Sequence, residues 1–282
     1  MDLNKTLIVH ILINNEQKKI WNSMYEKNIR LLKLLGYSNT HLLEYSPHIA
    51  NNLPIDYYKT IERAECFAAL DQSLLSQYDY FIILDIDSFL LRRFEDMNNL
   101  LKDFDQPALM FFNNEELKEK NYCNMSFGLY SSSFLISLID SLKSELALIN
   151  SMSFKQYMSK EFLPYNDEIL RKVSKSEIVS FDKLFFNCIF QKYNLTGIFD
   201  LNDFVSKSSS TFVDAHIMED LSLSNLKLEN KFNRPKQRKD INKNIKDAYF
   251  IHFSNEVKEE NKLIIRFMNK NILPEKKTKK TK

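Results

Sequence analysis

One short segment, residues 80–84 (YFIIL), constrains the fold more than any other part of the chain. A continuous apolar run rich in isoleucine and aromatic residues predicts a strand that is buried on both faces of a parallel sheet. Asp85 and Asp87 follow it, and alternation along a strand would put both carboxylates on one side, opposite Ile86. Neighbouring carboxylates repel each other unless a cation lies between them. The pair therefore predicts a divalent-cation site at the carboxyl end of a strand, where α/β sheets bind ligands.

The beginning of the chain predicts an α/β fold. Residues 6–12 and 40–45 read as strands, and residues 18–35 between them carry apolar residues at helical spacing. Gly36 is expected to end this helix as its C′ residue. A strand–helix–strand opening indicates a mostly parallel central sheet flanked by helices.

The remaining segments predict further elements of the same kind. We expect one domain over residues 1–272, followed by a basic, disordered tail over 273–282. The expected elements are a helical stretch at 57–75, a strand at 108–112, a turn or strand at Gly128 leading into a helix to residue 142, an inserted loop or short helices at 146–175, a helix at 181–193 with Ser180 or Asp182 as N-cap, a strand and turn at 197–204, a loop at 206–211, a mobile charged segment at 226–247, a strand at 248–253 and a helix at 255–270.

Composition narrows the class of protein and of partner. The chain has 282 residues, 44% of them hydrophobic, which is enough for a full core. Its net charge of +2 predicts no nucleic-acid partner. No signal peptide, no apolar run of about 18 residues and no paired cysteines are found, which predicts a cytoplasmic protein. The alternative for the basic tail is weak contact with the cytoplasmic face of a membrane, at about 1 kcal/mol per basic residue.

Glycine is scarce, and this excludes two nucleotide-binding motifs. The chain has three glycines, and neither a G-x-G-x-x-G fingerprint nor a Walker loop can be built from them. If a nucleotide binds, its phosphates must be held by a metal ion and by basic side chains.

An apolar strand that ends in D-x-D, early in an α/β chain, resembles the GT-A glycosyltransferases. The resemblance implies that Asp85 and Asp87 bind Mn²⁺ or Mg²⁺, which bridges the diphosphate of a nucleotide-sugar donor. A UDP-sugar is favoured, and a GDP-sugar is the alternative. The segment from Arg63 to Tyr80 is also similar to fungal α-mannosyltransferases of the same superfold.

The end of the chain narrows the resemblance to glycosyltransferase family 8, the glycogenin and lipopolysaccharide galactosyltransferase group. Residues 252–258 read HFSNEVK and are similar to the H-x-x-G-x-x-K part of that family's late motif. Asn255 replaces the glycine, and the Pro-Trp that follows in the family is absent. The resemblance implies that His252 is a third metal ligand and that Lys258 contacts the diphosphate. Mixed carboxylate and imidazole ligands favour Mn²⁺ over Mg²⁺.

Other segments match the same family at single positions. Residues 182–187 (DKLFFN) are similar to D-Q-D-x-L-N, with Asp182 and Asn187 matching and Lys183 and Leu184 departing. Residues 124–130 (NMSFGLY) stand in the place of F-N-x-G-V, which lines the sugar site and implies donor contacts from Asn124 and Gly128. A basic residue on the helix before the metal strand contacts the nucleotide in the family, which implies Lys59 or Arg63 here.

The resemblance implies a metal-dependent hexosyltransferase that retains the configuration of the transferred sugar. Its acceptor would be a glycan, lipid-linked or protein hydroxyl, and an inverting reaction would instead need a carboxylate base. Candidates for that base are Asp182, Asp167 and Glu168. Two other functions stay open: a catalytically silent module that binds nucleotide-sugars, and a sugar nucleotidyltransferase, which the absence of glycine from residues 14–19 disfavours.

Each candidate also has a purely structural interpretation. Asp85 and Asp87 could cap the next helix, Asp182 could be an N-cap, and Arg63 with Lys59 could form a solvated helix face. His252 could be an ordinary strand histidine. His10 and His216 are expected to be structural or solvent-facing.

Overall fold

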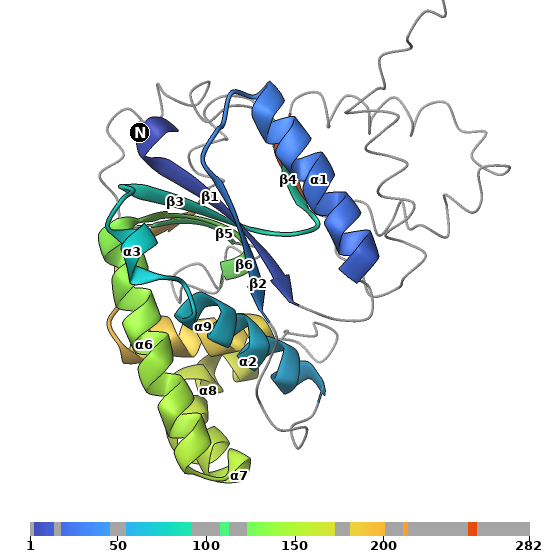
Figure 1. Cartoon of the computed structure of the whole chain (residues 1–282). Coiled ribbons are helices and arrows are strands. Elements are labelled where there is room, and N and C mark those ends of the chain that lie inside the picture. Colours follow the sequence, from blue (N-terminus) through green and yellow to red (C-terminus); the bar gives the residue numbers. More distant parts are fainter. Residues whose placement is uncertain are drawn as a thin grey trace, which may run out of the picture. The chain divides into compact units, whose positions relative to one another are not determined.

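The computed structural model describes residues 3–13, 18–45, 55–91, 108–112, 123–172, 181–200, 211–213 and 248–252 (Figure 1). The chain divides into two compact units, and each is described by itself. Unit 1 comprises residues 1–14, 39–85 and 98–204, and unit 2 comprises residues 15–38, 86–97 and 205–282. The single domain over residues 1–272 stays a prediction, and the basic tail lies outside the described residues.

Unit 1 contains a six-stranded sheet with the order β2-β1-β3-β6-β5-β7. Strands β2 and β3 pair parallel with β1, and β7 pairs parallel with β5. Strand β6 runs antiparallel to both of its neighbours, β3 and β5. The α/β fold with a mostly parallel sheet is therefore confirmed. The strands are β1 (Thr6–Ile13), β2 (Thr40–Tyr45), β3 (Tyr80–Asp85), β5 (Ala108–Phe112), β6 (Cys123–Ser131) and β7 (Ile198–Asp200).

Helices pack on this sheet and supply most of the core of unit 1. Figure 1 shows α2, α6, α8 and α9 gathered on one side of the sheet. Side chains such as Val9, Phe81 and Ile83 from the sheet join Phe67 and Phe186 from the helices in one buried cluster. The helical elements are α2 (Ile55–Ala68), α3 (Gln72–Leu75), α6 (Ser132–Ser151), α7 (Phe154–Tyr157), a π-helical turn (Met158–Phe162), α8 (Leu163–Lys172) and α9 (Phe181–Lys192), with a 3₁₀ turn (Leu3–Lys5) before β1.

Strand β3 is buried as its composition predicts. All four residues from Phe81 to Leu84 are buried, so both faces of the strand are covered. Alternation along the strand sends Phe81 and Ile83 into the cluster with the helices, while Ile82 and Leu84 face the other way. The continuous apolar run thus reflects a central strand with no solvated face.

A charged cluster lies among the helices of unit 1, and its Glu145 side chain is completely buried. Lys192 Nζ on α9 lies 2.9 Å from Glu145 Oε2 on α6 and 2.6 Å from Glu161 Oε2 on the π-helical turn. The Tyr193 hydroxyl donates to the same Glu145 oxygen at 3.0 Å, and the Cys188 thiol donates to the Glu161 carbonyl at 3.4 Å. Burial and then the charge of Glu145 raise the pKa of Tyr193 to about 12. The cluster ties three helical segments together.

Unit 2 contains a second sheet and one long helix. The sheet has the order β4-β9-β8, with β4 (Ser88–Leu90) antiparallel to β9 (Ala248–His252) and β8 (Thr211–Val213) parallel to it. Helix α1 (Lys18–Leu34) packs against β4. Gly36 has φ 86° and the Tyr37 N–H donates to the Leu32 carbonyl at 2.9 Å, which confirms Gly36 as the C′ residue.

Several element boundaries differ from those the sequence predicts. The expected helix at 57–75 is two helices, because Asp71 accepts a hydrogen bond from the Ser73 N–H and caps α3 anew. Helix α6 continues to Ser151, so the loop expected from residue 146 was wrong there, while the short helices expected after it are present. At Gly128, where a turn or a strand was expected, the strand is confirmed, because Gly128 lies within β6. Thr211 begins a strand instead of ending a loop.

Residues 226–247 and 255–270, and His216, lie outside the described residues, whereas His10 is buried in β1. Among the described residues, no helix has both the length and the apolar character needed to cross a membrane.

Candidate functional site

Three predicted site residues of unit 1 meet where β3 ends. Arg63 on α2 places Nη2 2.5 Å from Oδ2 of Asp85, the last residue of β3. Its Nη1 lies 3.3 Å from Oδ2 of Asp182, in the first turn of α9. One guanidinium thus joins two carboxylates from separate segments of the chain. We call these three residues the Arg63 cluster.

Local structure explains how each member is held. On α2, Ile61, Ala64 and Phe67 are buried, so that face of the helix is fixed against the core. On α9, every residue from 184 to 190 is buried, which fixes the first turn of the helix. An acidic residue there also interacts favourably with the helix macrodipole.

The Arg63 cluster is partly accessible to solvent. The side chains of Arg63, Asp85 and Asp182 are 20%, 16% and 26% exposed. Burial raises the pKa of Asp182, the Arg63 guanidinium opposes that rise, and the Asp85 carboxylate adds to it. With both carboxylates ionised, the three groups carry one net negative charge, so the cluster attracts a further cation.

Asp85 retains an oxygen that could bind such a cation. Its described contacts use Oδ2, and none of those described uses Oδ1. Carboxylate oxygens suit Mg²⁺ and Mn²⁺, so the donor chemistry fits the predicted ion. Among the described side chains, no three His, Cys, Asp or Glu residues come together as a metal site. The side chain of His252 is not among those described.

Within unit 2, the turn after β3 brings two predicted positions into register. Ile86 and Asp87 form the turn, and Ser88 begins β4. In the antiparallel pairing with β9, Ser88 stands opposite His252. The backbone of His252 is therefore aligned with the residue that follows Asp87. Strand β3 ends at Asp85, and Asp87 lies in the turn that follows. The prediction that strand alternation puts the Asp85 and Asp87 carboxylates on one side was therefore wrong.

The two predicted sugar-site residues belong to β6. Leu84 pairs with Phe127, so residues 123–125 of this antiparallel strand extend past Asp85, the end of β3. Asn124 pairs with Phe111 in this part, and its side chain is not described. Gly128 has a structural reason, because a Cβ there would lie 2.2 Å from the Tyr130 ring.

Other predicted residues are placed less completely. Asp167 is an exposed residue on α8, and Glu168 and Lys59 lie on α8 and α2 with side chains outside the described set. Lys258 lies outside the described residues. Asn187, which matches the family motif, is buried and donates to Asn166 Oδ1 at 3.0 Å, so it joins α9 to α8.

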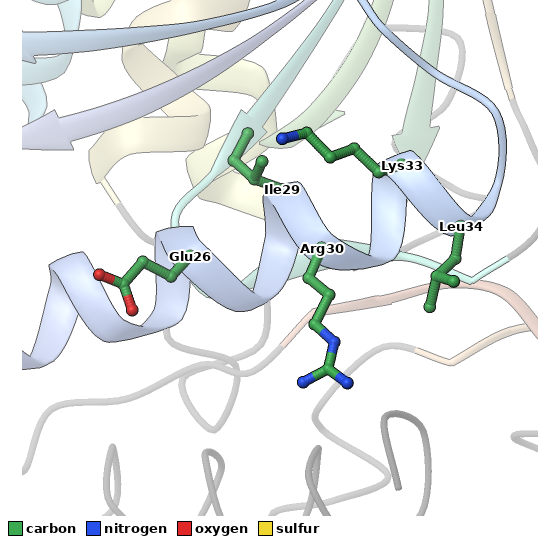
Figure 2. A pocket seen from close by; sticks show the side chains of 5 residues that line it. All are labelled: Glu26, Ile29, Arg30, Lys33 and Leu34. Carbon is green, nitrogen blue, oxygen red and sulfur yellow. The ribbon is translucent and has the colours of Figure 1, made fainter. Parts of the chain in front are cut away.

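Sequence reasoning missed one residue next to the D-x-D segment. Asn28 on α1 is fully buried, and its Nδ2 donates to the Ile86 carbonyl at 3.0 Å. The available signal was a polar residue in the apolar stripe of Met24, Leu31 and Leu32. Another face of α1 borders a shallow hollow (Figure 2), and none of its lining residues was predicted as a site: Glu26, Ile29, Arg30, Lys33 and Leu34.

Comparison with known proteins finds similarity at the level of structure. No family model and no curated protein matches the sequence. A glycosyltransferase involved in glycosylation of the major capsid of PBCV-1 matches 93% of this chain and 98% of its own, with 9% identity and a TM-score of 0.47. The galactosyltransferase LgtC matches 92% of this chain and 95% of its own, with 12% identity and a TM-score of 0.41. The catalytic domain of Drosophila β1,4-galactosyltransferase 7 matches 47% of this chain and 51% of its own, with 12% identity and a TM-score of 0.31.

The chain thus matches solved structures of glycosyltransferases over more than nine-tenths of its length. Identities and TM-scores this low describe an arrangement of elements and not a shared activity.

Proposed function

We propose that this protein is a nucleotide-sugar-dependent glycosyltransferase whose donor diphosphate is held through a divalent cation, Mn²⁺ or Mg²⁺, on Asp85, Asp87 and His252. The observation that carries the proposal is the Arg63 cluster, in which a guanidinium joins Asp85 at the end of β3 to Asp182 on α9. The register of Ser88 with His252 supports the third ligand. A bound cation would act as a Lewis acid that stabilises the departing diphosphate.

The chain's own residues have defined tasks in this proposal. Arg63 holds the Asp85 carboxylate through Oδ2, which orients Oδ1 and adds positive charge near the phosphates. Lys258, with Lys59 as a further candidate, provides the positive charge that a glycine-rich loop provides in other nucleotide-binding proteins. Asn124, at the same sheet edge, contacts the donor sugar, while Gly128 leaves room for the Tyr130 ring.

The transfer step breaks the bond between the anomeric carbon and the phosphate oxygen. The bonding electrons leave with the phosphate, and an acceptor hydroxyl forms the new bond. In a retaining reaction, which the family resemblance favours, the leaving phosphate oxygen accepts the hydroxyl proton. In an inverting reaction a carboxylate accepts it, and Asp182 is the candidate in the Arg63 cluster, ahead of Asp167 and Glu168. The acceptor class and a cytoplasmic location stay predictions.

The test combines metal removal with removal of the carboxylates. Donor hydrolysis and transfer are measured over UDP- and GDP-sugars with added Mn²⁺, with EDTA, and in the Asp85→Asn/Asp87→Asn double variant. We expect each treatment to lower the rate by at least about 100-fold, as loss of a transition-state charge partner does. Asp79→Asn is the matched control, because Asp79 precedes the same strand and is well exposed. Activity that survives both chelation and the double substitution would exclude the metal model.

One observation favours a second function, a nucleotide-sugar-binding module without turnover. Leu184 stands where the resemblance places a second aspartate, and it is buried in the core of unit 1. Binding calorimetry beside the activity assay distinguishes the two functions. Donor binding with no hydrolysis or transfer on any acceptor would select the silent module.

A further inference from the structure

One polar residue interrupts the buried stripe of α1. Met24, Leu31 and Leu32 are buried on this helix, and Asn28 is fully buried among them at the same helical spacing. Burying an amide opposes folding unless its polar atoms form hydrogen bonds. An apolar side chain would meet the packing requirement without that cost. The position of Asn28 therefore needs an explanation other than packing.

The one described hydrogen bond of the Asn28 side chain reaches the peptide between the two aspartates. Its Nδ2 donates to the carbonyl oxygen of Ile86 at 3.0 Å. The Ile86 side chain is buried, and α1 packs against β4, which begins at Ser88. All of these residues belong to unit 2. Helix α1 thus holds the turn at Ile86 through this hydrogen bond. Strand β4, which follows the turn, is held by its pairing with β9.

The Oδ1 atom of the Asn28 side chain is buried and forms no hydrogen bond within the described part of the chain. An unsatisfied buried acceptor is destabilising, so the amide is retained at a cost in stability. Its Nδ2 donor, aimed at a single backbone carbonyl, is the group that a smaller or apolar residue could not replace.

We propose that Asn28 is a positioning residue for the D-x-D turn. By holding the Ile86 carbonyl, it fixes the peptide that joins Asp85 to Asp87 and so sets the direction of the Asp87 carboxylate before a cation binds. Groups that orient metal ligands commonly change metal affinity by about 10- to 100-fold when they are removed. This inference rests on the proposed function, because it assigns a task to Asn28 only if the aspartates bind a metal.

The competing interpretation is that Asn28 merely joins α1 to β4. A purely structural role predicts that Asn28 variants lose stability but bind metal as the wild type does. Met24→Ala supplies the comparison, because Met24 lies one turn earlier in the same buried stripe and its truncation loosens α1. Asn28→Leu and Asn28→Ala both remove the donor. The leucine side chain fills the space of the amide, whereas the alanine side chain leaves it empty. An effect common to both variants comes from the lost hydrogen bond.

The experiment uses the full chain and two measurements. Direct Mn²⁺ titration, followed by the paramagnetic resonance of free Mn²⁺, should give a Kd about tenfold or more weaker in both Asn28 variants than in Met24→Ala and the wild type. Hydrogen exchange of the metal-free protein should be faster at residues 86–88 in both Asn28 variants. If the wild type binds Mn²⁺ and the Asn28 variants bind it equally well, the inference is wrong and the proposed function stands. If the wild type binds neither Mn²⁺ in this titration nor Mg²⁺ in calorimetry, the metal-dependent function and the inference are both wrong.

Discussion

Unit 1 contains two clusters in which one basic side chain lies between two carboxylates, and the fold places them differently. In the Arg63 cluster, the carboxylates come from the end of a sheet strand and from the first turn of a helix. In the second, which we call the Lys192 cluster, Lys192 lies between Glu145 and Glu161, all from helical segments. Both carry the same formal charge when every group is ionised.

Complete burial of one carboxylate, Glu145, separates the two clusters. Each side chain of the Arg63 cluster is partly exposed, whereas the Glu145 side chain is completely buried and also accepts from the Tyr193 hydroxyl. A carboxylate that is fully buried among helices serves mainly to keep those helices together, because moving them apart would remove the partners that compensate its buried charge. Carboxylates at an accessible strand end can exchange part of their contacts for a ligand. The comparison predicts that stability depends on the Lys192 cluster and activity on the Arg63 cluster.

Lys192→Met gives the largest expected change. Removing the ammonium group leaves the buried Glu145 carboxylate without its cation, which lowers the free energy of unfolding by about 3–5 kcal/mol. Chemical denaturation measures this loss, and the transfer rate per folded molecule should stay unchanged. A loss below about 1 kcal/mol would mean that the Lys192 cluster is equivalent to a surface ion pair.

Arg63→Met should have the opposite profile. We expect the rate of sugar transfer or donor hydrolysis to fall by about 100- to 1000-fold, because a charge near the leaving diphosphate is lost. The free energy of unfolding should change by about 1 kcal/mol or less, since the ion pairs are partly exposed. Steady-state kinetics and denaturation on the same preparation test both parts. A large stability loss with normal activity per folded molecule would reverse the assignment of the two clusters.

Asp182→Asn sharpens the comparison within the Arg63 cluster. If Asp182 contacts a sugar, losing the charged acceptor should raise the activation barrier by about 1.5–3 kcal/mol, which lowers kcat/KM by roughly 10- to 160-fold. Stability should be maintained or slightly raised, because burial opposes the charged form and raises the pKa of this carboxyl. Glu161→Gln in the Lys192 cluster is the matched control, and it should leave kcat/KM unchanged. Equal kinetics for wild type and Asp182→Asn would remove Asp182 from the site.

Each cluster has a buried thiol beside it, and these thiols predict a dependence of stability on pH. Burial raises the pKa of Cys66 and of Cys188 from 9.0 to about 12. Below pH 9 both thiols are protonated in the folded and unfolded chains, so neither affects stability. Between pH 9 and 12 the unfolded chain loses these protons first, so unfolding becomes easier by up to about 1.4 kcal/mol per pH unit for each thiol, and by about 1 kcal/mol from pH 9 to pH 10.

Cys188→Ala and Cys66→Ala test this dependence one thiol at a time. In each variant the free energy of unfolding should decrease less between pH 9 and pH 10 than in the wild type, by the part that the missing thiol contributes. Denaturation at the two pH values measures this. The two variants should differ least from each other in this pH dependence, because burial is the main cause of the pKa shift at both sites. An unchanged pH slope in either variant would show that its thiol ionises equally in folded and unfolded chains.

Local signals in the sequence predicted much of the fold. The strands at 40–45 and 108–112 and the helix ended by Gly36 follow from short apolar runs, helical spacing and one glycine with positive φ. The antiparallel place of β6 between β3 and β5 was missed, because strand order depends on contacts between distant segments. The last turns of α6 were also missed, since Leu146 and Ile149 are stabilised by packing against the core.

The site was predicted as a set of residues but not as an arrangement. Arg63, Asp85 and Asp182 were all candidates, yet Arg63 was expected to contact a nucleotide, and its described ion pairs are with the two carboxylates. These ion pairs depend on how α2 and α9 pack against each other, and the spacing of residues in the sequence does not predict that packing. Asn28 was missed for a related reason, because its partner is a backbone carbonyl 58 residues away.

The pairing of Ser88 with His252 also has a consequence for the order of folding. Unit 1 uses no residue beyond 204, so its segments can associate while the rest of the chain is still being synthesised. Strand β9 joins β4 to β8, and the Ser88–His252 pair closes a loop from residue 88 to residue 252. Closing so long a loop is slow compared with local contacts. We therefore expect the strand that carries His252 to dock last, so that a nascent chain completes its core before it acquires its full set of proposed metal ligands.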